Sequence, residues 1–339
     1  NYPELFGVLE MSEHKPFRFS LQSFNTDSPA NWRNLIAKTE DLGYSTFFLA
    51  DHFLSAGPAL DSTYHPPQML AAVPAIAMAL EQTSTLRVGC RVFCNDYRHP
   101  IILAKEAATM DYLSEGRLEF GLGAGWIKNE YEAVNLPFDE FPQRFERFAE
   151  FVHAYKAFMS GEPLDVAGDF IKWSGFSGTP TPAQAPYPPL MIGGGSKKIL
   201  SFAGQEADII SLNFNNRAGM LGPDGMASGL AAATAKKIDW IKSGAGARFK
   251  DIELEIGAYS TIITDQQKPT AAAIGDALGM SGDDILSHPH CLIGSVDFIC
   301  EELQRRRETY GISYIAVLDD GTNNMAETFA PVVARLAGK

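Results

Sequence analysis

The 339-residue sequence has few cysteines and no long apolar run. Its four cysteines, at positions 90, 94, 291 and 300, form no Cys-x-x-Cys pair, which argues against a zinc or thioredoxin-like centre and favours a reduced, cytoplasmic setting. The longest uncharged apolar stretch, residues 69–80, contains Pro74 and is shorter than the ~18 residues that a membrane span needs. The start of the chain also lacks the basic and apolar segments of a secretory signal. We therefore expect a cytoplasmic protein without a membrane partner.

Basic residues are also scarce relative to acidic ones. The chain carries 28 lysines and arginines against 41 aspartates and glutamates, a net charge of −13. Such a charge repels phosphate backbones and anionic lipids, so nucleic acid is excluded as an expected partner. Hydrophobic residues make up 45% and charged residues 20% of the sequence, as in an ordinary globular protein with a sizeable core. The composition thus favours a folded protein and argues against disorder as its main state.

From Phe17 onward, short β-branched or aromatic runs alternate with longer helical patterns. This alternation is typical of βα units around a parallel sheet. Helix ends are also marked: Ser28 and Pro29 suit the start of one helix, Gly43 its end, and Ser295 the start of another. The predicted strands cover residues 17–22, 45–50, 86–92, 117–122, 189–193, 208–213, 253–263 and 312–318.

Eight such units predict an α/β fold of the (β/α)8 type, a TIM barrel. That fold needs ~250 residues, so roughly 90 remain. We assign residues 1–16 to a leader and residues 17–339 to a single barrel domain. Four segments rich in Gly, Pro, Ser and Asp are interpreted as loop insertions, at 54–66, 160–188, 214–228 and 264–294,. We expect 160–188 and 264–294 to shape the substrate entrance.

An ionisable pair follows the second predicted strand. Reactive groups of such barrels lie where strands end at the C-terminal face, and Asp51 and His52 stand at that point. His52 can exchange protons near neutral pH, and Asp51 can orient it or balance its charge. The alternative is a hydrogen-bonded histidine at a strand end with no role in catalysis.

Glycines follow two further strands. After the fourth strand, Gly121, Gly123 and Gly125 permit close backbone approach, and Trp126 offers a flat apolar wall. Their place in the chain argues against the dinucleotide fingerprint, which opens the first βαβ unit. The run 189–198, Pro-Leu-Met-Ile-Gly-Gly-Gly-Ser-Lys-Lys, is a strand that enters a glycine turn and then a helix. Its amides, hydroxyl and lysines would suit a phosphate dianion, although a glycine turn with solvated lysines has the same sequence.

These separate motifs occur in an order that resembles the luciferase-like flavin and deazaflavin oxidoreductases, from Phe17 almost to the C-terminus. The resemblance implies a (β/α)8 barrel, usually a homodimer, with a ring system held over a bulge in the third strand. In that family the bulge carries a non-prolyl cis peptide, which would be Arg91 to Val92 here. The matching segments are Asp51-His52-Phe53, Arg98-His99-Pro100, Leu113-Ser114-Glu115-Gly116-Arg117, Gly121-Leu122-Gly123-Ala124-Gly125-Trp126, Glu130-Tyr131, Arg144-Phe145-Glu146-Arg147 and Gly193-Gly194-Gly195.

Within the family, the pattern looks more like the deazaflavin branch, which uses coenzyme F420, than the FMN monooxygenases. The resemblance then implies hydride transfer between F420 and an unidentified small organic substrate; the alternative is an FMN-dependent monooxygenase that uses molecular oxygen. If the residue roles of the family apply at the matching positions, His52 would donate or accept the proton, and Trp126 would line the substrate pocket. Contacts to the cofactor would come from Asp51 and His52 at the ring, Arg91 and Val92 behind it, Gly123, Gly125 and Asn129 at its edge or side chain, and Gly194, Gly195 and Ser196 at the phosphate.

The chain departs from the family's deazaflavin sugar dehydrogenases at two places. Trp126 stands where those enzymes have a glutamate acid, and Ala56 near the position of a tryptophan. We therefore expect a more apolar substrate than a sugar phosphate.

Two other functions were weighed. A metal-dependent hydrolase could draw ligands from Asp51-His52 and from the run 288–291, His-Pro-His-Cys, but zinc hydrolases need three convergent ligands, and the sequence assembles no such set. We predict no metal. A non-catalytic flavin-binding relative would share the fold and lack turnover, so only kinetics would separate it from an enzyme.

Overall fold

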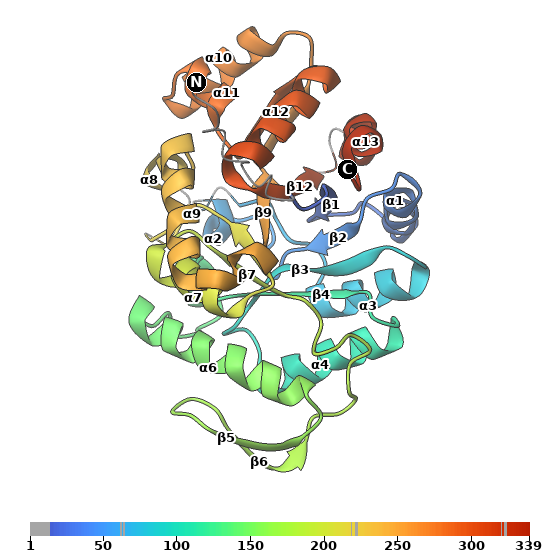
Figure 1. Ribbon diagram of the computed structural model, residues 1–339, viewed down its shortest axis with the longest axis vertical. Coiled ribbons are helices and arrows are strands. Elements are labelled where there is room, and N and C mark those ends of the chain that lie inside the picture. Colours follow the sequence, from blue (N-terminus) through green and yellow to red (C-terminus); the bar gives the residue numbers. More distant parts are fainter. Residues whose placement is uncertain are drawn as a thin grey trace, which may run out of the picture.

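The computed structural model describes residues 14–339 except 62, 64, 218, 221–222, 320 and 322–323. Of the predicted leader, residues 1–13 lie outside the described residues. Eight parallel strands close into a barrel in the order β1-β12-β9-β8-β7-β4-β3-β2 (Figure 1), which confirms the predicted (β/α)8 fold. The strands are β1 (Arg18–Ser23), β2 (Thr46–Leu49), β3 (Arg87–Cys94), β4 (Leu118–Gly123), β7 (Leu190–Gly194), β8 (Ile209–Leu212), β9 (Glu253–Ala258) and β12 (Ile312–Asp319).

Helices surround the barrel on its outer side (Figure 1), and their ends follow the predicted chemistry. Ser28 Oγ accepts the Asn31 amide at 3.1 Å, and Ser295 Oγ accepts the Phe298 amide at 3.2 Å. Gly43, at φ +81°, takes the left-handed conformation that glycine adopts without steric cost,. No helix in the described part of the chain is both long and apolar enough to span a bilayer. The outer helices are α1 (Pro29–Asp41), α3 (Ala72–Gln82), α4 (Pro100–Leu113), α5 (Lys128–Ala133), α6 (Phe141–Met159), α7 (Lys197–Glu206), α9 (Ala231–Ala245), α12 (Val296–Tyr310) and α13 (Met325–Leu336).

The strand predicted over residues 253–263 is in fact two strands. β9 belongs to the barrel and is buried throughout, whereas β10 (Ser260–Ile263) leaves the barrel and pairs with β11 (Cys291–Gly294). Residues 253–263 contain no proline that would mark the end of the barrel strand. The sequence pattern therefore did not reveal the change of sheet.

The four predicted loop insertions contain regular structure, so their interpretation as loops was wrong. Short or weakly amphipathic elements give little periodic signal. The elements are α2 (Pro58–Asp61), α8 (Pro223–Ala227), α10 (Gln267–Leu278), α11 (Gly282–Ser287), the strand β11, and the hairpin of β5 (Pro163–Ala167) and β6 (Lys172–Ser177).

The β5–β6 hairpin lies far from the carboxyl ends of the strands. It connects α6 to β7, and connections from a helix to the next strand run on the amino-terminal side of such a barrel. Trp173 of β6 packs edge-on against Phe158 of α6, with ring centroids 6.3 Å apart, and Figure 1 shows the hairpin beyond α6 and α4. The prediction that residues 160–188 shape the substrate entrance is therefore wrong.

A fully buried carboxylate, Glu119, ties the amino-terminal ends of the barrel strands together. It accepts hydrogen bonds from Arg18, from Arg87 Nε at 2.9 Å, from Thr46 Oγ1 at 3.2 Å and from the Tyr314 hydroxyl at 3.0 Å. Burial opposes ionisation, but the two arginines outweigh it and lower the pKa of Glu119,. Residues from β1, β2, β3 and β12 thus converge on one charge in β4.

Replacing Glu119 by glutamine should destabilise the barrel by about 3 kcal/mol, because the half-buried Arg87 guanidinium loses its carboxylate partner and Arg18 keeps only Glu253, at 2.7 Å,. Urea unfolding at neutral pH measures this change. Glu146→Gln, an exposed site on α6, is the matched control and should alter the free energy of unfolding by no more than about 0.5 kcal/mol. Equal stability of the two variants would contradict the structural role given to Glu119.

Candidate active site

Asp51, directly after β2, is held by an arginine and not by the neighbouring histidine. Its two carboxylate oxygens accept hydrogen bonds from the Arg98 guanidinium at 2.6 and 2.7 Å, and the Cys94 amide donates a third at 2.9 Å. Such bidentate pairs fix the geometry of both side chains. The prediction that Asp51 orients or charge-balances His52 is therefore wrong, because Arg98 engages both of its oxygens. Contact of Asp51 with a cofactor stays a prediction.

His52 is paired instead with Glu130 of α5. His52 Nδ1 lies 2.6 Å from Glu130 Oε2. The same buried carboxylate accepts the Phe53 amide at 2.7 Å and the Tyr97 hydroxyl at 2.5 Å. Burial favours the neutral acid, but the hydrogen bonds, first that of His52, outweigh it and lower the pKa of Glu130,. An ionised Glu130 keeps a proton on Nδ1, so Nε2 is the ring nitrogen available for proton exchange.

Two further rings enclose His52. The His65 ring packs at 4.1 Å between centroids, and Trp126 meets both imidazoles edge-on, at 6.1 Å from His52 and 5.9 Å from His65. Burial, followed by the proximity of His52, lowers the pKa of His65 to about 3, so this ring is neutral at physiological pH. His52 keeps 13% of its side chain exposed. The result is one accessible imidazole within an uncharged aromatic wall.

The third barrel strand carries the predicted irregularity. The Arg91–Val92 peptide bond is cis, and the pairing of β3 with β4 shifts register between Cys90 and Phe93; both features confirm the sequence-based prediction. The Arg91 guanidinium turns inward and donates to Glu255 at 2.8 Å and to Gln22 at 3.0 Å. A cofactor contact of Arg91 would therefore involve its backbone.

The half-buried Val92 side chain projects from β3 and covers the packed interior of the barrel. It packs on a cluster of buried side chains from the neighbouring strands, and glycines give it room. A β-carbon on Gly123 would lie 2.8 Å from Val92 Cγ2, and one on Gly193 would lie 3.2 Å from Val92 Cγ1. The cluster beneath it consists of Phe48, Met191, Ile209 and Tyr314.

Internal packing also explains Gly125. It has φ +72°, and a β-carbon there would lie 1.8 Å from the Tyr131 hydroxyl. The structure thus supplies an internal reason for glycine at positions 123 and 125. Asn129 lies half-buried on α5. That these three residues line a cofactor stays a prediction.

The triple-glycine turn joins β7 to α7 as predicted. Gly195 approaches the end of β8 so closely that a β-carbon would lie 2.3 Å from the Phe214 carbonyl oxygen. Ser196 is the N-cap of α7 and accepts the Ile199 amide at 3.4 Å. The first amides of a helix have no partner within it and favour an anion. Lys198 lies 4.2 Å over the Phe145 ring, and its contribution to phosphate binding stays a prediction.

A buried lysine that the sequence did not reveal lies behind this turn. Lys237 of α9 is 2% exposed, and its ammonium donates to the Asn213 carbonyl at 2.5 Å. Burial lowers its pKa to about 8, which leaves it mostly charged at neutral pH. A β-carbon on Gly195 would lie 2.6 Å from the same Asn213 carbonyl oxygen. The corner therefore combines helix amides with a nearby positive charge.

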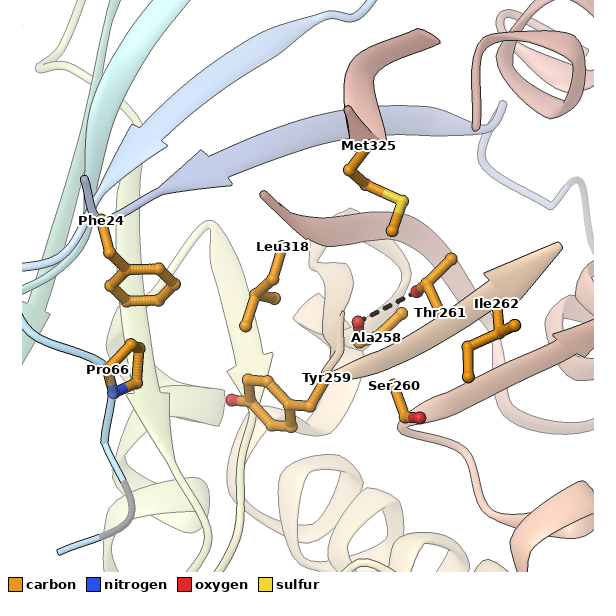
Figure 2. Close-up of a pocket in the computed structure, with 9 residues that line it drawn as sticks. All are labelled: Phe24, Pro66, Ala258, Tyr259, Ser260, Thr261, Ile262, Leu318 and Met325. Carbon is orange, nitrogen blue, oxygen red and sulfur yellow. Dashed lines mark hydrogen bonds between the residues drawn. The ribbon is translucent and has the colours of Figure 1, made fainter. Parts of the chain in front are cut away.

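A groove of about 250 Å³ opens beside this site at the barrel mouth (Figure 2). We call it the mouth groove. In Figure 2, Phe24 and Pro66 stand on one side of Leu318, and Thr261 and Ile262 stand on the other. Its apolar lining comes from Phe24, Pro66, Ala258, Ile262, Leu318 and Met325, and its polar lining from Tyr259, Ser260 and Thr261.

The histidines considered as metal ligands serve a different purpose. His288 and His290 pack against Phe214, with ring centroids 6.1 and 4.6 Å away, and His290 Nδ1 is bonded to the Gly257 carbonyl oxygen at 2.8 Å. Within the described ranges, no group of three His, Cys, Asp or Glu side chains could hold a metal ion.

Besides Lys237, sequence reasoning missed three groups around His52: Glu130, Tyr97 and His65. Glu130 stood in a segment used for the family resemblance, but nothing local linked it to His52, 78 residues away. His65 lay in a segment interpreted as a loop. A carboxylate in the first turn of a short helix was the one available signal, and many surface helices share it.

The residues present fit a phosphorylated tricyclic cofactor. His52 follows β2, Val92 lies on β3, Gly123 on β4 and Gly195 after β7, and these strands are consecutive neighbours in the barrel. Three interstrand steps span about 14 Å, which suits a ring with a phosphorylated chain. The triple-glycine corner lies at one end of this line and His52 at the other.

Comparison with known proteins places this geometry in context. A family model described as luciferase-like monooxygenase matches residues 6–273. An FMNH(2)-dependent dimethylsulfone monooxygenase from Pseudomonas putida is 24% identical over 188 residues, 56% of this chain and 48% of that protein. An F420-dependent glucose-6-phosphate dehydrogenase from Amycolatopsis mediterranei is 28% identical over 217 residues, 64% of this chain and 59% of that protein. The aligned part of the chain thus spans about half the length of these relatives.

The fold is similar to that of a coenzyme F420 dependent tetrahydromethanopterin reductase from Methanopyrus kandleri. The TM-score is 0.72 at 17% identity, with 95% of this chain and 98% of that chain covered. At this identity the likeness concerns the fold alone.

The buried neutral state of His65 predicts acid sensitivity. Below its ordinary pKa of about 6.5, the unfolded chain binds a proton at this ring that the folded protein does not bind until about pH 3,. The free energy of unfolding therefore falls with pH in this window, by up to about 2 kcal/mol between pH 6.5 and 5. His65→Asn should reduce the loss by that amount in urea titrations. At pH 8 the free energies of unfolding of the unchanged protein and of His65→Asn should differ only through the change in packing. If that difference stays constant from pH 8 to 5, the lowered pKa assigned to His65 is contradicted.

Proposed function

The chain belongs to the luciferase-like monooxygenase family, and from that premise we propose that it is an oxidoreductase that transfers hydride between coenzyme F420 and a small organic substrate. Relatives in the family are named for F420 or for FMN, so a flavin-type cofactor is common to both. The observation that carries the proposal is the Glu130–His52 pair at the barrel rim. A hydride acceptor such as a carbonyl also needs a proton at its oxygen, and this pair provides a site for one.

The cofactor and the protein divide the chemistry between them. When bound, a deazaflavin exchanges hydride through a ring carbon and does not readily activate oxygen. Hydride arriving at a carbonyl carbon leaves negative charge on the oxygen, and protonated His52 would neutralise it from Nε2. In the oxidising direction, neutral His52 would take the hydroxyl proton. Glu130 would stabilise the imidazolium in both directions,.

The remaining residues bind, orient and exclude water. The amides from Gly194 to Ser196 would hold the phosphate, and Val92 would support the ring from behind. Trp126 and His65 shield one side of His52, so that proton exchange with bulk water is limited there. The dimethylsulfone monooxygenase relative supports the second candidate, an FMN-dependent monooxygenase that uses molecular oxygen.

Cofactor binding separates the two candidates. We expect the purified protein to bind F420 with micromolar or tighter affinity and FMN at least tenfold more weakly, as measured by fluorescence or absorbance titration. Gly195→Val should weaken both, because any side chain there meets the Phe214 carbonyl. Ala37→Val, at an exposed position of α1, controls for a general effect of adding a valine side chain. Selective binding of FMN would transfer the proposal to the monooxygenase, and binding of neither would refute both.

Substitutions of the histidine pair test the proton transfer. His52→Ala should lower kcat by about 10²–10⁴-fold with cofactor affinity retained, because a general acid–base group contributes that factor. Glu130→Gln should lower kcat less and change the pH profile, since it alters the charge beside the imidazole and not the imidazole itself. Glu132→Gln, exposed on the same helix, is the control. Unchanged turnover of His52→Ala with intact cofactor binding would make His52 merely structural.

A further inference from the structure

The mouth groove lies within two side-chain contacts of His52. Phe24, which lines the groove, meets the His65 ring edge-on at 5.4 Å, and His65 packs on His52 at 4.1 Å. Pro66 also lines the groove, and its carbonyl oxygen is bonded to His65 Nδ1 at 2.8 Å. A molecule in the groove would therefore lie about one aromatic ring, that of His65, away from His52.

The groove offers an apolar surface with one available hydroxyl. Six of its nine lining residues are apolar. The Thr261 hydroxyl is bonded to the Ala258 carbonyl at 3.1 Å, and the Tyr259 hydroxyl to Asn213. Among the described lining residues, Ser260 Oγ makes no hydrogen bond within the protein. The groove can thus satisfy one polar atom of a ligand and otherwise contacts its carbon skeleton.

The groove lining carries no charge, and the arginine behind it is already paired. None of the nine lining residues is ionisable near neutral pH. Arg91, behind Tyr259, is engaged by Glu255 at 2.8 Å. Tyr259 also stacks on His290 at 5.1 Å, and burial lowers the pKa of both His288 and His290, so these rings are neutral. An anionic ligand would lose its hydration without gaining a counter-ion.

We propose that the mouth groove binds the uncharged, mainly hydrocarbon body of the substrate, and that the substrate is a small neutral carbonyl compound or alcohol. The assignment of the reacting group rests on the proposed function; the assignment of the groove rests on its lining alone. Its volume of about 250 Å³ is below the roughly 300–1,000 Å³ of drug-sized ligand sites, which limits the body to a short chain or a single ring.

The experiment is a binding series with 2-butanone, 2-hexanone, 2-octanone and octanoate, by calorimetry, on the protein with and without cofactor. Affinity for the ketones should rise by up to about fourfold per added CH₂, because each buried CH₂ contributes about 0.8 kcal/mol. Octanoate should bind at least tenfold more weakly than 2-octanone. Equal affinity across the ketones, or tighter binding of octanoate, would overturn the proposal.

Variants locate the binding to the groove. Ile262→Trp should fill it and remove the dependence of affinity on chain length, while Met78→Trp, exposed on α3, should keep it. Leu318→Phe provides a second filling variant if Ile262→Trp does not fold by circular dichroism. Retention of the dependence in a folded filling variant would overturn the assignment. Cofactor binding is measured in a separate titration. If the protein binds F420 but not the ketones, only the assignment of the groove is refuted. If it binds the ketones but neither F420 nor FMN, only the proposed function is refuted.

Discussion

The arrangement of the rim depends on one buried carboxylate. Glu130 accepts hydrogen bonds from an imidazole, a backbone amide and a phenol that come from the loops after β2 and β3. Because an unpaired buried carboxylate is costly, these three donors and the acceptor hold one another in place. The orientation of His52, the choice of its exchanging nitrogen and the aromatic wall around it all follow from this contact.

The two ends of the barrel use buried charge differently. At the amino-terminal end, Glu119 is surrounded by donors from four strands and neutralised by arginines, an arrangement that ties strands together. At the carboxyl end, Glu130 holds a histidine that keeps one nitrogen unbonded and some exposure to solvent. Glu119 thus stabilises the barrel, whereas Glu130 holds a histidine that is partly exposed. This agrees with the usual division of such barrels into a stabilising face and a functional face. From His52, the triple-glycine corner after β7 and the mouth groove over β1, β12 and β9 lie in opposite directions around the rim.

Several features of the site were predictable because they are local. The triple-glycine turn before a helix and the position of His52 after a strand depend on residues within a few positions of one another. The partner of His52 was not predictable in this way. Asp51, adjacent in sequence, was the natural choice, but successive residues of an extended chain point to opposite sides. Asp51 therefore meets Arg98, and the carboxylate that reaches His52 comes from another βα unit.

The sequence by itself determined the alternation of strands and helices, the eight-strand count, the helix caps and, through its resemblance to a family, the cis peptide at Arg91–Val92. The alternation, the strand count and the helix caps follow from hydrophobic periodicity and local hydrogen bonding, which act over short separations. Only the tertiary structure decided which carboxylate pairs with His52, that β10 leaves the barrel, that the β5–β6 hairpin lies away from the entrance, and that a neutral groove adjoins the site. Each of these is set by closure of the barrel, which brings together residues from distant units whose pairing no local pattern encodes.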